Sequence, residues 1–129
     1  MNRTPRVFHI TTRSAWRDAE QKGPYVAPSL STEGFIHNST LSQVLPVAEK
    51  FYRGQTGLVL LVIDPARLTS ILKWEPPSDC APPPGVPAGE AFPHIYGPIN
   101  LEAVLEVLDF QADSSGRFQL PSSLKTGTR

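Results

Sequence analysis

The six-residue run Leu58-Val59-Leu60-Leu61-Val62-Ile63 decides the fold, because every one of its side chains is apolar. A strand that is covered on both faces has this composition, whereas a strand with one wet face alternates between apolar and polar residues. The run is also far shorter than the roughly 18 apolar residues that indicate a membrane-spanning helix. We therefore predict a buried β-strand over residues 58–63, with other elements covering both of its faces.

Shorter β-prone segments lie on both sides of this run in the sequence. Residues 6–12 and 104–110 contain several β-branched or aromatic side chains. Residues 71–75 alternate between apolar and charged side chains, which is typical of a half-buried strand. The same criteria predict strands over residues 34–39 and 92–96.

Two helices are predicted in the N-terminal half of the chain. Thr12 is placed to cap a helix over residues 13–22. Thr40 and Gln43 form a capping-box pattern in front of an apolar stripe with helical spacing. Pro46 lies inside this second helix and is expected to kink it or to delay its start. Helices inserted early among mostly β segments indicate the α+β fold class.

The length of 129 residues is that of one ordinary domain. We predict a single domain over residues 1–129, with a core over about residues 6–121. The 12 basic and 12 acidic groups cancel, which argues against general nucleic-acid binding, because phosphate affinity needs concentrated Lys and Arg. No signal peptide or membrane segment is visible, so a cytoplasmic location without membrane contact is expected. The sequence does not identify a protein partner.

Eight prolines and three glycines occupy 11 of the 23 positions from 76 to 98. Proline-rich chain favours polyproline II and is kept out of sheet interiors, so we predict an extended loop over residues 76–89. We expect this loop to lie beside the functional site, because it leads into residues 90–96; an inert insertion is the alternative. Cys80, within the loop, has no neighbouring base that would activate it as a nucleophile. Residues 122–129 are polar and are expected to be frayed.

Each of the three histidines lies in a β-prone segment and is followed, two positions later, by a hydroxyl residue. The pairs are His9 with Thr11, His37 with Ser39, and His94 with Tyr96. Side chains two positions apart on a strand project from the same face. Each segment therefore presents an imidazole beside a hydroxyl. We predict that the three histidines converge on one pocket, although 28 and 57 residues separate them in sequence.

The third segment carries the most candidate chemistry. Glu90, His94 and Tyr96 share one strand face if the strand begins as early as residue 90. A carboxylate, an imidazole and a phenol on one face are suited to acid/base chemistry or to binding ribose hydroxyls. Structural roles are the alternatives: a satisfied core histidine, an aromatic core residue with a wet hydroxyl, and a solvated Glu90.

Other chemistries have weaker sequence support. No pair of histidines has the short spacing of a local metal motif, so we expect no metal site. The chain also has no P-loop, no GxGxxG dinucleotide motif and no GxSxG nucleophile motif. The common nucleotide-binding and hydrolase fingerprints are therefore excluded.

Four segments resemble a bacterial family of unknown function, the domain-of-unknown-function family number nine-five-two. They are residues 8–12, 33–39, 60–64 and 92–98. The last of these, Phe-Pro-His-Ile-Tyr-Gly-Pro, is the most specific motif. The resemblance covers about residues 6–121, which is almost the whole chain.

The same motifs are similar, more distantly, to the ADP-ribosyltransferase-like fold. This resemblance implies a mixed, split β core and a site directed at NAD or a related nucleotide. It implies that His9 and Thr11 bind the ribose hydroxyls of that cofactor, with Ser39 as a third cofactor-binding residue.

The resemblance also implies catalytic residues. His37 would pack at the nicotinamide side, and His94 would orient the acceptor together with Tyr96 or Glu90. The predicted function is an NAD- or ADP-ribose-directed transferase-like enzyme of the ADP-ribosyl or 2′-phosphotransferase type. The alternative is a non-catalytic module on the same fold that binds a nucleotide-like ligand or a protein.

Overall fold

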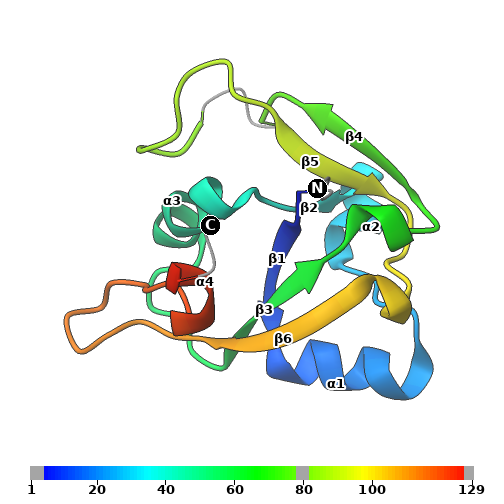
Figure 1. Cartoon of the computed structure of the whole chain (residues 1–129), viewed down its shortest axis with the longest axis horizontal. Coiled ribbons are helices and arrows are strands. Elements are labelled where there is room, and N and C mark those ends of the chain that lie inside the picture. The colour runs from blue at the N-terminus through cyan, green and yellow to red at the C-terminus, as the bar shows by residue number, and fades with distance from the viewer. Residues whose placement is uncertain (1–4, 78–81, 127–129) are drawn as a thin grey trace.

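Six strands form two antiparallel sheets in the computed structural model, which describes residues 5–77 and 82–126 (Figure 1). The first sheet has the order β1-β3-β6. It consists of β1 (Val7–Thr12), β3 (Leu58–Ile63) and β6 (Val104–Phe110). The central strand β3 is buried at all six positions, so the strand predicted over residues 58–63 is confirmed.

The second sheet has the order β2-β5-β4 and consists of β2 (Ile36–His37), β5 (Phe92–Tyr96) and β4 (Ile71–Glu75). Phe8 and Ser39 exchange two backbone hydrogen bonds of 2.8 Å, which tie the end of the β2 segment to β1. The α+β class is confirmed. The prediction of a mixed β core was wrong, because every pair of the described strands is antiparallel. Strand composition does not encode strand direction.

The two predicted helices are present with the predicted caps. In α1 (Arg13–Lys22), the Ala15 amide donates to Thr12 Oγ1 over 3.1 Å. In α3 (Leu41–Phe51), Thr40 and Gln43 form the capping box. Pro46 lies inside α3 and does not delay its start, because the helix begins directly after its cap.

A third helix, α2 (Pro28–Glu33), was not predicted from the sequence. It has six residues and none of them is buried, so it leaves no apolar stripe in the sequence. Gly34 ends it with a φ of 91°, a left-handed conformation that glycine adopts without strain. The strand predicted over residues 34–39 is therefore limited to β2.

Three short helical elements complete the described chain. They are the 3-10 turns η1 (Pro65–Arg67) and η2 (Leu101–Ala103) and the helix α4 (Ser122–Thr126). Helix α4 lies in the tail that was expected to be frayed, and Leu124 packs against the core. Residues 127–129 lie outside the described chain.

The first sheet has an apolar cluster on each face, which explains the all-apolar composition of β3. Val59, Leu61 and Ile63 face a cluster that includes Trp16 of α1 and residues of the second sheet. Leu58, Leu60 and Val62 face the cluster that includes α3 and the end of β6. No helix of the described residues is long and apolar enough to cross a membrane.

Candidate functional site: a pocket lined by three histidines

All three histidines line one pocket with a volume of about 440 Å³. The His37 and His94 rings have centroids 5.6 Å apart, and His9 Nδ1 lies 2.6 Å from the backbone oxygen of His37. The predicted convergence of the three histidines is therefore confirmed. The pocket is lined by Phe8, His9, Ile10, Glu33, His37, Asn38, Ser39, Val47, Phe51, Tyr52, Pro77, Pro83, Phe92 and His94.

His9 lies at the back of the site and has a hydrogen bond at each ring nitrogen. Nδ1 contacts the His37 carbonyl, and Nε2 lies 2.8 Å from the Tyr25 hydroxyl. The Tyr25 oxygen also lies 2.9 Å from Thr11 Oγ1. This chain of contacts connects β1, the end of β2 and Tyr25. His9 and Thr11, predicted to bind a ribose, are thus engaged with protein groups.

Burial also fixes the charge of His9. Desolvation lowers the pKa of His9 to about 4, so the ring is neutral at pH 7. A carbonyl can only accept, so Nδ1 carries the proton and Nε2 accepts from the Tyr25 hydroxyl. Burial likewise raises the pKa of Tyr25 to about 12, which keeps that hydroxyl protonated. His9 and Tyr25 therefore form a neutral structural pair.

His94 lies on β5 and is held by a carboxylate from the neighbouring strand. Its Nδ1 lies 2.7 Å from Glu75 Oε1, and the Tyr96 hydroxyl donates to the same oxygen over 2.6 Å. The hydrogen bonds from Tyr96 and His94 lower the pKa of Glu75, and the bond to Glu75 raises the pKa of Tyr96. A carboxylate paired with one nitrogen of an imidazole orients the ring for proton transfer at the other.

The second ring nitrogen of His94, Nε2, has no hydrogen-bond partner among the described residues. The His94 side chain is 3% exposed and lines the pocket. In the neutral ring, Nδ1 donates to Glu75 and Nε2 presents a lone pair. His94 thus has one nitrogen held by Glu75 and one nitrogen that is available to a ligand.

The carboxylate predicted beside His94 and Tyr96 was Glu90, and the structure places Glu75 there instead. Strand β5 begins at Phe92, so Glu90 lies in the preceding loop and is not a lining residue of the pocket. Tyr96 does not line the pocket either; it acts on it through Glu75.

The position of Glu75 beside His94 has a signal in the sequence. The strands predicted over residues 71–75 and 92–96 flank a single loop, and consecutive strands often pair. The antiparallel pairing observed sets Glu75 opposite Phe92 and Lys73 opposite His94. Side chains on the same face reach diagonal neighbours, and this brings the Glu75 carboxylate to His94.

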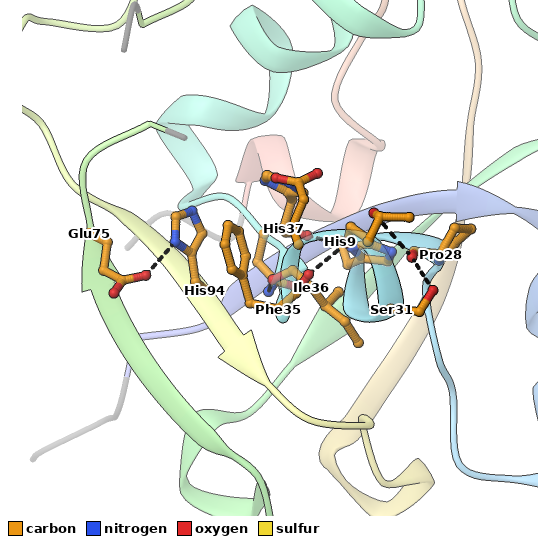
Figure 2. Close-up of polar contacts among 12 residues, drawn as sticks. His9, Pro28, Ser31, Phe35, Ile36, His37, Glu75 and His94 are labelled. Atoms are coloured by element: carbon orange, nitrogen blue, oxygen red, sulfur yellow. Dashed lines mark hydrogen bonds and ion pairs between the residues drawn. The ribbon is translucent and has the colours of Figure 1, made fainter. Parts of the chain in front are cut away.

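Figure 2 shows the Phe35 ring between His94 and His37. Phe35 stacks on His94, with ring centroids 4.1 Å apart and planes at 22°, and meets His37 edge-on at 4.9 Å. His37 Nε2 lies 3.1 Å from both carboxylate oxygens of Glu33. Phe35 and Glu33, neither of which was predicted as a site residue, therefore orient two of the three imidazoles.

Asn38 and Ser39 supply further polar groups to the pocket wall. Asn38 Nδ2 donates to the carbonyls of Ile36 and Pro93, over 2.8 and 3.4 Å. Asn38 Oδ1 is buried and is the one side-chain atom of that kind without a partner among the described residues. Because both contacts of Nδ2 are with acceptors, exchanging the amide oxygen and nitrogen would not satisfy this group.

The proline-rich loop borders the pocket, as predicted. Pro77 and Pro83 are lining residues, and Val86 is buried. Residues 78–81, which include Cys80, lie outside the described chain. Among the described residues, no group of three or more metal-ligating side chains is close enough to hold a metal ion.

These features define a small α+β domain with a histidine-lined pocket. The family model described as "Protein of unknown function (DUF952)" matches residues 10–107, and the chain belongs to this family. The family resemblance stated from the sequence is thereby confirmed. No curated protein matches the chain significantly.

Solved structures of one bacterial protein are similar to this chain over nearly its whole length. The crystal structure of protein CC0527 from Caulobacter crescentus has 31% sequence identity and a TM-score of 0.78, covering 93% of this chain and 98% of that one. The solution NMR structure of CC0527 has 33% identity and a TM-score of 0.71, covering 89% and 92%. These relatives support the observed α+β fold; the ADP-ribosyltransferase-like resemblance has no support among them.

Proposed function

We propose that the pocket binds the nucleoside end of an NAD- or ADP-ribose-like molecule and that the chain is a transferase-like enzyme. In this proposal His94 exchanges a proton with the bound molecule or its acceptor. The observation that carries the proposal is the state of His94: Glu75 fixes Nδ1, and Nε2 has no protein partner in the described chain.

The size and lining of the pocket support a small-molecule ligand. Small-molecule sites have volumes of roughly 300–1,000 Å³ and apolar walls with a few polar groups. This pocket has about 440 Å³ and apolar walls from β1, α3 and the proline-rich loop. A flat heterocycle fits such walls, and the polar groups around His37 and His94 can bind its substituents.

The proposal also assigns roles that differ from those implied by the sequence resemblance. Both nitrogens of His9 are occupied by protein groups, so His9 and Thr11 act by holding β1 and β2 together. Ser39, which lines the pocket beside Asn38, takes over the ribose-binding role. His94 is the proton carrier, Glu75 and Tyr96 position it, and the proposal assigns no role to Glu90.

The test is calorimetric titration of the chain with NAD and ADP-ribose, with His94→Ala as the variant. Loss of a ligand hydrogen bond to a charged or polar partner costs about 1.5–3 kcal/mol, which corresponds to roughly ten- to a hundred-fold in affinity. We expect this loss in His94→Ala, with a much smaller loss of unfolding free energy. If the melting temperature falls by many degrees while affinity per folded molecule is unchanged, His94 is a structural residue and the proposal fails.

A matched pair of carboxylate variants sharpens this test. Neither glutamate lines the pocket; Glu75→Gln removes the carboxylate partner of His94, whereas Glu90→Gln makes the same chemical change in the loop before β5. We expect weaker binding and slower turnover only in Glu75→Gln. Equal effects of the two substitutions would contradict the positioning role of Glu75.

The non-catalytic binding module is the second candidate, and one observation favours it. Phe51 lines the pocket with a residue exposure of 52%, as expected of an apolar contact for a larger partner. Mass spectrometry of NAD incubated with the chain separates the two candidates. Release of nicotinamide supports the enzyme, and binding without any consumption of NAD supports the module.

A further inference from the structure

We infer that the pocket selects a ligand part that donates hydrogen bonds and carries no phosphate: an uncharged or cationic heteroaromatic amine or nucleoside. This inference rests on the proposed function and specifies the substrate class of the same site. It follows from the charges of the lining residues and from the polar lining atoms that have no hydrogen-bond partner in the described chain. It predicts that any phosphate of a larger ligand stays outside the pocket.

No Lys or Arg is among the lining residues of the described chain. The loop that borders the pocket cannot add one, because residues 76–112 contain five acidic residues and no basic residue. Lys50 places its ammonium 5.2 Å from the centroid of the Phe51 ring, but it is not a lining residue and it contacts another group as well. A phosphate bound in the pocket would therefore lack the charged partners that phosphate sites use.

Lys73 is not a lining residue either, and its ammonium lies 4.8 Å from the centroid of the Tyr96 ring; several other basic side chains form ion pairs elsewhere. Arg53 Nη2 lies 3.1 Å from a carboxylate oxygen of Glu49, and Lys22 Nζ lies 3.2 Å from one of Asp18. Arg13 pairs with Asp109. None of these basic residues lines the pocket.

Among the described lining residues, the carboxylate is that of Glu33. Glu33 is a lining residue, and its side chain is 42% exposed and bonded to His37 Nε2. A carboxylate attracts a cation and repels a phosphate. Its partial exposure weakens this effect through solvent and salt without reversing its sign.

Two polar atoms of the pocket wall have no hydrogen-bond partner among the described residues and can accept hydrogen bonds. Asn38 Oδ1 is buried without a partner among the described residues, and its amide orientation is fixed by two carbonyls. His94 Nε2 is an acceptor in the neutral ring. A ligand that supplies N–H or O–H donors satisfies these atoms, whereas a phosphate, which offers acceptors, leaves them unpaired.

The aromatic walls favour a flat ring. Phe8, Phe51 and Phe92 are lining residues of the pocket. Aromatic faces bind cationic rings and ammonium groups through their negative faces. The walls and the acceptors therefore agree on one ligand class, a donor-bearing aromatic ring without negative charge.

The experiment compares ligands that differ only by a phosphate. Calorimetric titration uses adenosine against AMP, and nicotinamide riboside against nicotinamide mononucleotide. We expect each nucleoside to bind at least tenfold more tightly than its phosphorylated partner, with a difference that shrinks in high salt. Equal or tighter binding of the phosphorylated partner overturns the inference.

Glu33→Gln tests the charge term separately. We expect it to weaken binding of the cationic nicotinamide riboside at least threefold and to change adenosine binding less than twofold. Glu20→Gln, on an exposed position of α1 outside the lining, is the matched control and is expected to change neither. An equal loss for both nucleosides in Glu33→Gln contradicts charge selection.

The failure of this inference is distinguishable from failure of the proposed function. If NAD and ADP-ribose bind, and AMP and nicotinamide mononucleotide bind at least as tightly as their nucleosides, the proposed function stands and the phosphate-free selection is wrong. If none of these probes binds, both are wrong. If each nucleoside binds at least tenfold more tightly than its phosphorylated partner and His94→Ala weakens this binding, both are supported.

Discussion

His9 and His94 lie on strands of different sheets, and both are almost fully buried, with exposures of 6% and 2%. Each directs Nδ1 to a protein oxygen, the His37 carbonyl in one case and the Glu75 carboxylate in the other. They differ at Nε2. The Tyr25 hydroxyl occupies it in His9, whereas no described residue occupies it in His94.

This difference separates a structural histidine from a candidate functional one better than burial does. A buried imidazole with two protein partners has no capacity left for a ligand. A buried imidazole can still bind a ligand when a carboxylate holds one nitrogen and the other nitrogen faces a pocket without a protein partner. The comparison predicts that His9 substitutions act on stability and that His94 substitutions act on binding.

The largest expected effect is that of His9→Ala. This substitution removes two buried hydrogen bonds, strands the His37 carbonyl and leaves a cavity, at a cost of roughly 3–5 kcal/mol in unfolding free energy. Urea denaturation measures it, with the more exposed His37→Ala as the control. A loss below about 1 kcal/mol would show that His9 is not a structural residue.

Acid is expected to destabilise the folded chain, because it protonates the buried His9 ring. The pKa of His9 is about 4 in the folded chain and about 6.5 when unfolded, so the unfolded state binds more protons between these values. Stability is complete above pH 6.5 and falls as the pH is lowered towards 4, by about 3 kcal/mol. Denaturation midpoints across this range, measured on the wild type and on His9→Gln, test this.

The variant supplies the decisive control, since Gln cannot titrate. Carboxylates with lowered pKa values, such as Glu49, add their own acid sensitivity only below about pH 4.5. Between pH 6.5 and 4.5, the unfolding free energy is therefore expected to fall less steeply with pH in His9→Gln than in the wild type. An identical slope in both proteins would show that His9 does not cause it.

The smallest expected effect comes from two tyrosines. Tyr25→Phe leaves buried Nε2 of His9 without a donor and is expected to cost about 1–2 kcal/mol. Tyr96→Phe removes a hydrogen bond to the partly exposed Glu75 and is expected to cost less than Tyr25→Phe, because water can replace that bond. Thermal denaturation measures the loss of stability in both variants. A larger loss in Tyr96→Phe than in Tyr25→Phe would contradict the structural role of the His9–Tyr25 pair.

Local pattern was sufficient for much of the fold. The run 58–63 predicted its own burial, and Thr12 and Thr40 predicted the starts of two helices through their capping side chains. These signals are local, because burial on both faces and a capping hydroxyl leave marks within a few residues. The histidine–hydroxyl repeat predicted which segments meet at the pocket.

The parts that the sequence analysis missed depend on contacts between distant segments. Glu75 reaches His94 only through the register of β4 and β5, and Tyr25 reaches His9 from outside any strand. Helix α2 has no buried residue and so no apolar period. Glu90 does not share a strand face with His94, because β5 begins two residues later, at Phe92.

The most direct test of the comparison is a nitrogen-15 NMR spectrum of the imidazole rings at pH 7, with and without NAD or adenosine. We expect His9 to be protonated at Nδ1 and its Nε2 signal to stay in place when ligand is added. We expect the Nε2 signal of His94 to shift on binding and this shift to be lost in Glu75→Gln. A ligand-dependent shift at His9 with none at His94 would show that the roles of the two histidines are reversed.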